Sequence, residues 1–279
     1  MLIVLALLGA VGYGASDFAG GLASRRTRPA TVLLYSHPAA AVVIALLLPL
    51  FPGSLDTRSS LLAALAGITG LVGFALMYHL MATSPLSVVS PITAVLAAAT
   101  PLGFGLLSGE HPSLTAWVGI AFGLVAVALI SGSSTGERRA ARRRARVLLL
   151  AFASGAGFGL YFVLLAHAYN ATTGLWPLMI TRSSSLVVII AVAARPGVTA
   201  TLDHRTALTA GCAGALDGAA DVCFLLATRH GYLSLVGVIT ALYPAITTLL
   251  ALHVLRERTG WLPRAGLALS VVSLALIAG

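Results

Sequence analysis

The sequence predicts an all-α membrane protein with ten transmembrane helices, arranged as two inverted repeats of five helices. Three observations support this fold class. Hydrophobic residues make up 58% of the 279 residues, charged residues only 9%, and the mean hydropathy is +0.99. A soluble domain carries about 25% charged residues, so this composition favours a membrane protein. The apolar residues also come in blocks of about 20, which is the length that crosses a bilayer. Finally, part of the first half of the chain recurs in the second half.

The ten predicted spans are separated by short connections that contain glycine, proline or charged residues. The exception is the polar stretch SGSSTGERRAARRRAR at 131–146, which carries seven charges near the middle of the chain. We therefore expect a first five-helix repeat at 1–132, a basic linker at 133–146 and a second five-helix repeat at 147–279. No basic region precedes the first apolar stretch, so we interpret it as the first span and not as a signal peptide. The spans are placed at 2–22, 31–50, 60–82, 86–107, 114–132, 147–168, 175–194, 207–228, 233–254 and 263–278.

The basic residues predict the orientation of these spans. All 17 are arginine, and the formal net charge is +9. The connections after spans 1, 3, 5, 7 and 9 hold 14 arginines, and those after spans 2, 4, 6 and 8 hold two; the remaining one is Arg182, inside a span. By the positive-inside rule the central linker is cytoplasmic and both chain ends lie outside. Because the arginines fit membrane connections, we do not expect nucleic acid as a partner.

The internal repeat gives the first indication of function. Residues 84–131 align without gaps on residues 231–278, with 16 identities in 48 positions. Since each half has an odd number of spans, the second half enters the membrane from the opposite side. Two such halves can rock about a shared site near the midplane and expose it to each side in turn, which favours a transporter. A passive channel remains an alternative, as does an integral-membrane enzyme or flippase acting on lipid-linked substrates, although the connections are short for a catalytic cluster.

Two segments carry a family resemblance: PLSVVSPITAVLAAATPLGFGLLSGEHPSLTAWVGIAFGLVAVALIS and LSLVGVITALYPAITTLLALHVLRERTGWLPRAGLALSVVSLALI. Both resemble the end of an EamA-type unit of the drug/metabolite transporter superfamily, and the resemblance covers essentially the whole chain. The shared marks are a Leu-Ser start, a mid-span proline, a glutamate that closes the span and a glycine in the following span. They correspond here to Pro244, Glu110, Glu257, Gly119 and Gly266.

The resemblance implies ten helices around a central cavity and export of small organic metabolites or drugs. We expect an inner-membrane protein that is a monomer or a homodimer. Each half of such proteins often carries an arginine near the start of its second helix. Arg182 fits that position, whereas the first half has Tyr35-Ser36-His37 there, so the charge is absent or replaced by His37. The family is often drawn with both termini inside; we keep the opposite orientation given by the arginines.

Four charged side chains lie within predicted spans, where each costs roughly 2.5–3.5 kcal/mol at a helix centre. Asp217 and Asp221 are one helical turn apart and share a face. Two ionised carboxylates about 6 Å apart repel each other, so we expect one to hold a proton near neutral pH and the two to titrate as a pair. The pair is either a site for a proton or a cationic substrate, or a structural pair bridged to Arg182. Asp217, with its small neighbours, is the stronger site candidate; Asp17 is the fourth embedded charge.

The other candidates each allow two interpretations. Asp17 is a cavity acid, at a place that resembles the acid in the first helix of the small multidrug resistance family, or a partner of the nearby arginines. Arg182 clamps a substrate carboxylate or holds an aspartate, and we favour the second. His79 is a proton relay or a packing residue, and Glu110 and Glu257 are expected to serve connections or caps. The sequence has no Walker loop, metal-ligand pattern or Gly-x-Ser-x-Gly motif, so we expect no cofactor, no metal and no enzymatic activity. The prediction is a secondary transporter that exports a small organic solute, with proton coupling left open.

Overall fold

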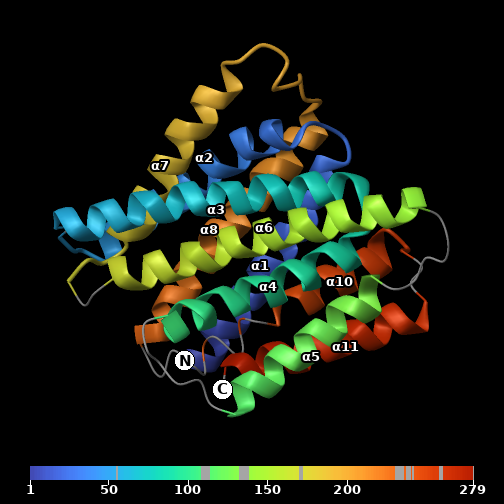
Figure 1. Ribbon diagram of the computed structural model, residues 1–279. Helices are drawn as coiled ribbons and strands as arrows, with labels where there is room; N and C mark the ends of the chain where they lie inside the picture. The colour runs from blue at the N-terminus through green and yellow to red at the C-terminus, as the bar shows by residue number, and fades with distance from the viewer. Residues whose placement is uncertain are drawn as a thin grey trace.

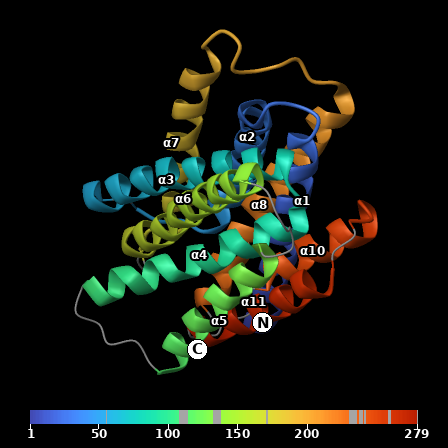
Figure 2. The same cartoon turned by 45° about the vertical axis from the view of Figure 1, so that its right-hand side comes forward.

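The computed structural model describes residues 1–54, 56–107, 114–131, 138–169, 172–229, 236, 240, 242–257 and 260–278. Within these residues the regular structure is helical, and no strand is present. The helices form a bundle in which most axes run roughly side by side (Figures 1 and 2). They are α1 (Leu2–Ser24), α2 (Pro29–Leu47), η1 (Leu48–Leu50), α3 (Thr57–Thr83), α4 (Leu86–Leu107), α5 (Leu114–Ser131), α6 (Arg138–Ala168), α7 (Trp176–Ala193), α8 (His204–Arg229), α10 (Tyr243–Val254) and α11 (Trp261–Ala278).

Six helical segments are long and apolar enough to cross a membrane. They are α1, α2 continued through η1, α3, the part of α6 from residue 145 onward, α7, and α8 up to residue 227. Shorter apolar helices lie at Leu86–Ala97, Tyr243–Val254 and Arg264–Ser273. The chain is therefore a multi-pass membrane protein, while the full count of ten spans stays a prediction.

The largest differences from the predicted spans are at the starts of α6 and α10. Helix α6 begins at Arg138, inside the predicted linker, because the alanines and arginines of RRAARRRAR are strong helix formers that extend the helix beyond the membrane span. Helix α10 begins at Tyr243, so Pro244 lies in its first turn. A proline fits there because the first-turn N–H groups have no partner within a helix. Most of the same predicted span before Tyr243, residues 233–242, lies outside the described residues.

Capping residues and prolines start several helices. Asp56 is the N-cap of α3, where its Oδ1 accepts a hydrogen bond of 2.7 Å from the backbone N–H of Ser59. The backbone and hydroxyl hydrogen bonds from Ser59 hold the pKa of Asp56 below its ordinary value. Pro29 and Pro177 occupy the first turns of α2 and α7, a position that suits their fixed φ.

Apolar side chains cover the outside of the bundle, and small and polar side chains lie in its interior beside larger apolar ones. On α1 the exposed residues are Ile3, Val4, Leu7, Leu8 and Val11, whereas the buried face holds Ala6, Gly9, Ala10, Gly14, Ser16, Asp17, Gly20 and Gly21. Small residues let helix backbones approach closely in a bilayer, and polar side chains there face the protein interior. The distribution is the one expected of helices surrounded by lipid.

The two halves pack against each other reciprocally. Helix α1, the first helix of the first half, packs on α8, and α6, the first helix of the second half, packs on α3. The α2–α7 and α5–α11 pairs also join matching helices of the two halves (Figure 1). The close approach depends on glycine: a Cβ on Gly214 of α8 would collide with the backbone of Ser36 on α2.

Hydrogen bonds between connections identify the two ends of the bundle. At one end, Glu257 after α10 accepts a 2.6 Å hydrogen bond from Arg25 after α1, and Arg25 also donates to the carbonyl of Ser84 between α3 and α4. At the other end, the N–H of Ser54 after η1 donates to the carbonyl of Thr172 after α6 (2.9 Å). Helices α1 and α6 thus finish at opposite ends, which is the arrangement that an inverted repeat requires. The two chain ends lie near each other in both views (Figures 1 and 2).

Candidate functional site

A buried cluster of charges joins α7 and α8. Nη2 of Arg182 donates to Oδ2 of Asp217 and to Oδ2 of Asp221, the second contact at 2.5 Å. The three residues are only 4%, 6% and 3% exposed. Because Asp217 and Asp221 are one turn apart on α8, one guanidinium reaches both carboxylates. The structure thus brings together three of the site residues predicted from the sequence. Arg182 forms ion pairs with the aspartates, which is the role that the sequence analysis favoured for it.

Helices α1 and α6 complete the surroundings of Asp221. The hydroxyl of Tyr13 on α1 donates to Asp221 Oδ1 at 2.7 Å, and the hydroxyl of Tyr161 on α6 lies 3.5 Å from the same oxygen. Both carboxylate oxygens of Asp221 therefore accept hydrogen bonds, one of them from Arg182. Since Tyr13 belongs to the first half and Asp221 to the second, this contact links the two halves at the cluster.

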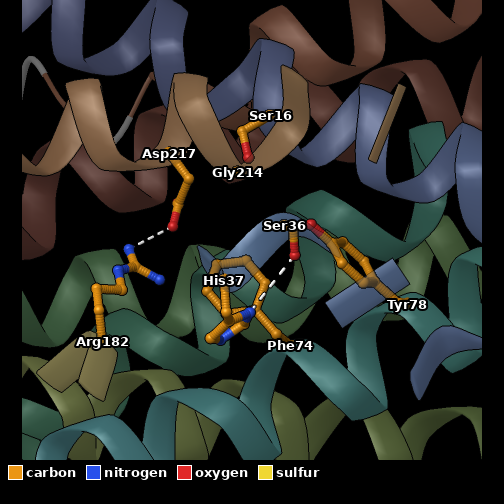
Figure 3. Close-up of a pocket in the computed structure, with 8 residues that line it drawn as sticks. All are labelled: Ser16, Ser36, His37, Phe74, Tyr78, Arg182, Gly214 and Asp217. Carbon is orange, nitrogen blue, oxygen red and sulfur yellow. Dashed lines mark hydrogen bonds and ion pairs between the residues drawn. The ribbon is translucent and has the colours of Figure 1, made fainter. Parts of the chain in front are cut away.

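Asp217 has a different environment, because it borders a small cavity (Figure 3). The cavity has a volume of about 10 Å³, which is room for about one water molecule. It is lined by Ser16, Ser36, His37, Phe74, Tyr78, Arg182, Gly214 and Asp217. Among the described residues, the Ser16 hydroxyl and the Arg182 Nε are buried without a hydrogen-bond partner. The small residues around Asp217 do leave space beside it, as expected, but the space here is far smaller than a wide central cavity.

Asp17 lies in the interior and not at the edge of the membrane-spanning part. It is 6% exposed, and its Oδ2 accepts a 3.3 Å hydrogen bond from the hydroxyl of Ser90 on α4. Within the described part of the chain it forms no ion pair, and Arg25 pairs with Glu257 instead. Asp17 is therefore a buried acidic side chain and does not pair with the arginines after α1.

The structure places a different histidine at the site from the one predicted. His79 is exposed on α3, because the helical period turns it away from its buried neighbours Tyr78 and Leu80. His37 on α2 is buried and lines the cavity, with its ring against Phe74 at 5.9 Å. The sequence signal for it was the polar pair Ser36-His37 within an apolar span. Tyr78 also lines the cavity, as does Ser16, which was not identified as a site residue from the sequence.

Glu257 lies outside this cluster and caps a helix of the other half. Its carboxylate accepts hydrogen bonds from the backbone N–H groups of Leu86 and Ser87 (3.2 Å each) and from the Ser87 hydroxyl (2.7 Å), in addition to Arg25. Burial acts to raise the pKa of Glu257, but the hydrogen bonds from Ser87 and Arg25 outweigh it, so this pKa lies below its ordinary value. The residue has the geometry expected of a cap; its counterpart Glu110 falls outside the described residues.

The two predicted glycines lie where α5 and α11 pack. The carbonyl of Gly119 on α5 accepts a 2.6 Å hydrogen bond from the hydroxyl of Ser273 on α11, and both Gly119 and Gly266 are buried. These positions contribute to helix packing and lie apart from the charge cluster. Among the described residues, no three His, Cys, Asp or Glu side chains gather as a metal site would require.

The fold and the buried cluster define a multi-pass membrane protein with charged side chains held between two packed halves. The sequence pattern of the EamA-like transporter family matches residues 1–132 and residues 145–279. The chain belongs to this family, and it carries the family unit twice. It is accordingly a multi-pass membrane transporter. A search of curated proteins gave no match.

Proposed function

We propose that this transporter exports a small organic solute across the inner membrane by alternating access and that it exchanges the solute for protons. The proposal includes ten helices in two inverted five-helix repeats and a cytoplasmic basic stretch at the start of α6. The observation that carries it is the Arg182–Asp217–Asp221 cluster, which is buried in membrane-spanning helices and contacts Tyr13 of the other half.

A purely structural role explains this cluster poorly. Taking charges out of water is so costly that replacing a buried ion pair by apolar residues is often neutral or stabilising. Two carboxylates on one guanidinium leave a further negative charge, which a bound proton can neutralise. Buried ionisable residues in membrane helices commonly mark such proton or substrate pathways. The cavity beside Asp217 supports this interpretation, because it leaves room for about one water molecule next to one carboxylate of the pair.

The contacts at the two ends of the bundle support an alternating mechanism. One end is held by Glu257 with Arg25 and the start of α4, and the other by the contact between Ser54 and Thr172. Both sets connect the first half to the second. Opening the cluster to one side requires one set to separate while the other holds, as in the rocking of two repeats.

The alternative functions lack comparable support. A passive channel needs a water path past the cluster, whereas the described residues leave room there for about one water molecule. An enzyme or flippase acting on lipid-linked substrates would need reactive side chains near the membrane surface. The buried cluster lies within helices α7 and α8 and fits transport better.

Uptake into everted membrane vesicles tests the proposed function. Vesicles with and without the chain are given a panel of amino acids and cationic dyes, with and without an imposed pH gradient. We expect at least one solute to accumulate faster in vesicles that contain the chain, with a dependence on the gradient. Asp217→Asn should abolish this uptake while the protein still inserts. Equal uptake by both vesicle types across the panel would overturn transport, and indifference to the gradient would overturn proton exchange alone.

A further inference from the structure

The charges inside the membrane do not balance, and the imbalance indicates what the site binds. Among the described residues, the spans contain three carboxylates, on Asp17, Asp217 and Asp221, and one guanidinium, on Arg182; the described acids Asp56, Asp203 and Glu257 lie in connections or at helix ends. An uncompensated charge in the membrane interior is strongly unfavourable. The surplus carboxylates must therefore be neutralised by protons or by a cationic ligand.

The hydrogen bonds distinguish the three acids. Asp221 accepts hydrogen bonds on both oxygens, from Tyr13 and from Arg182, and so has its partners within the protein. Among the residues that the structure describes, Asp17 accepts a hydrogen bond from the Ser90 hydroxyl alone, and it does not line the cavity. Asp217 is engaged through Oδ2 alone, and within the described part of the chain its Oδ1 accepts no hydrogen bond. Asp217 is thus the acid whose neutralising partner can be exchanged through the cavity.

The rings around the cavity suit a positive charge. Phe74 and Tyr78 line it together with Asp217, and their ring centroids lie 5.6 Å apart. Phe74 also meets the ring of Phe158 at 4.8 Å, so further aromatic side chains pack behind this side of the cavity. Aromatic faces attract ammonium groups, most strongly where water is excluded. The remaining titratable groups around Asp217 are Tyr13 and Asp17 on α1, His37 on α2 and Tyr161 on α6.

We propose that the transported solute is a monovalent organic cation with an aromatic or apolar body, and that it replaces the proton on Asp217 one for one. This inference rests on the proposed transport function. When the cation binds, the Asp217 carboxyl group releases its proton and the resulting carboxylate pairs with the cation. On the return step the proton binds and the site is neutral again. Each cycle moves one cation one way and one proton the other, so it transfers no net charge.

The test uses the purified full-length protein in proteoliposomes that contain a pH-sensitive dye. The probe is benzyltrimethylammonium, a permanent cation that cannot carry a proton itself. Phenylacetate and phenylalanine, an anion and a zwitterion of similar size, are the comparisons. We expect added benzyltrimethylammonium to make the interior alkaline at several times the rate in protein-free liposomes, and we expect the two comparisons to have no effect. An imposed membrane potential should change the rate by less than about twofold, because exchange of equal charges does not respond to voltage.

Variants separate the exchanging acid from its neighbours. Asp217→Asn should abolish the cation-driven pH change, Asp217→Glu should restore part of it, and Asp17→Asn, which resembles the protonated acid, should preserve it. A response to phenylalanine or phenylacetate without one to the cation would overturn the inference and leave the transport function standing. A strong dependence on voltage, or loss of exchange in Asp17→Asn but not in Asp217→Asn, would also overturn it. If no probe of any charge moves and the vesicles show no uptake, both the inference and the proposed function fail.

Discussion

Replacing Arg182 by methionine should destabilise the protein more than any other single change at the cluster. The substitution keeps an unbranched side chain but leaves two buried carboxylates without their cation. Removing one partner of a buried pair costs about 3–5 kcal/mol, because the remaining charge stays buried. For a chain of this size 1 kcal/mol corresponds to roughly 2–4 °C in Tm, so we expect Arg182→Met to lower Tm by roughly 6–20 °C.

The matched variants show whether this cost arises from the charge cluster. Asp221→Asn keeps an acceptor for Tyr13 and leaves Arg182 paired with Asp217, so it should cost about 1.5–3 kcal/mol, the value of a hydrogen bond to a charged group. Arg195→Met removes an exposed arginine after α7 and should change stability by less than about 0.5 kcal/mol.

Thermal unfolding of the purified protein in detergent, followed by the loss of helical circular dichroism, measures these effects. The double variant Arg182→Met/Asp221→Asn should be more stable than the sum of the two single costs predicts, since it removes a carboxylate together with its cation. If Arg182→Met is as stable as Arg195→Met, or if the two cluster substitutions are strictly additive, the reasoning about charge compensation is wrong.

Three further substitutions test other parts of the structure. Glu257→Gln should lower stability by about 1 kcal/mol at neutral pH, the typical value of a helix cap. Because the pKa of Glu257 is lowered in the folded protein, the ionised carboxylate stabilises the fold at any pH above 4.5, the ordinary pKa of a glutamate. This stabilisation is lost as the pH falls further, so the Tm values of the wild type and of this variant should converge between pH 7 and pH 3. Tyr13→Phe should lower the free energy of unfolding by about 1.5–3 kcal/mol, because it removes a hydrogen bond to the Asp221 carboxylate. The same thermal unfolding measures this effect, and an unchanged Tm would contradict the contact. Gly214→Ala should destabilise the protein by about 1–3 kcal/mol, because the new Cβ would meet the α2 backbone. Its control, Gly211→Ala on the same helix, places a Cβ with no atom within 4 Å and should be neutral or stabilising by up to about 1 kcal/mol. Equal effects of the two substitutions would show that α2 and α8 do not approach so closely.

The sequence predicted the membrane fold well, because length and apolar composition determine where a helix can cross a bilayer. The predicted and observed bounds of the fourth helix are identical at 86–107. The start of α6 was predicted too late, because hydropathy marks where the lipid begins and not where the backbone becomes helical. Pro244 was predicted in mid-span from the family resemblance; it lies in the first turn of α10, and its position within the span stays a prediction.

The site was predicted in part. The charges Asp217, Asp221 and Arg182 were found because charged residues are rare in apolar spans, and the helical period placed both aspartates on one face. Their contacts with Tyr13 and Tyr161 depend on the packing of α1 and α6 against α8, which no local pattern specifies. For the same reason the sequence could not choose between His79 and His37, since which face of a helix is buried is decided by its neighbours.

The central claim is that the cavity beside Asp217 opens alternately to the two sides of the membrane. Ser36 lines this cavity and is only 4% exposed, so Ser36→Cys places a thiol inside it. The native Cys212 and Cys223 are first replaced by serine, and a membrane-impermeant thiosulfonate is applied to right-side-out and to everted vesicles. We predict that the introduced thiol reacts from both sides and that reversing the pH gradient changes which side reacts faster. A thiol that reacts from one side only, or from neither side under any gradient, would contradict alternating access and make the cluster a structural brace.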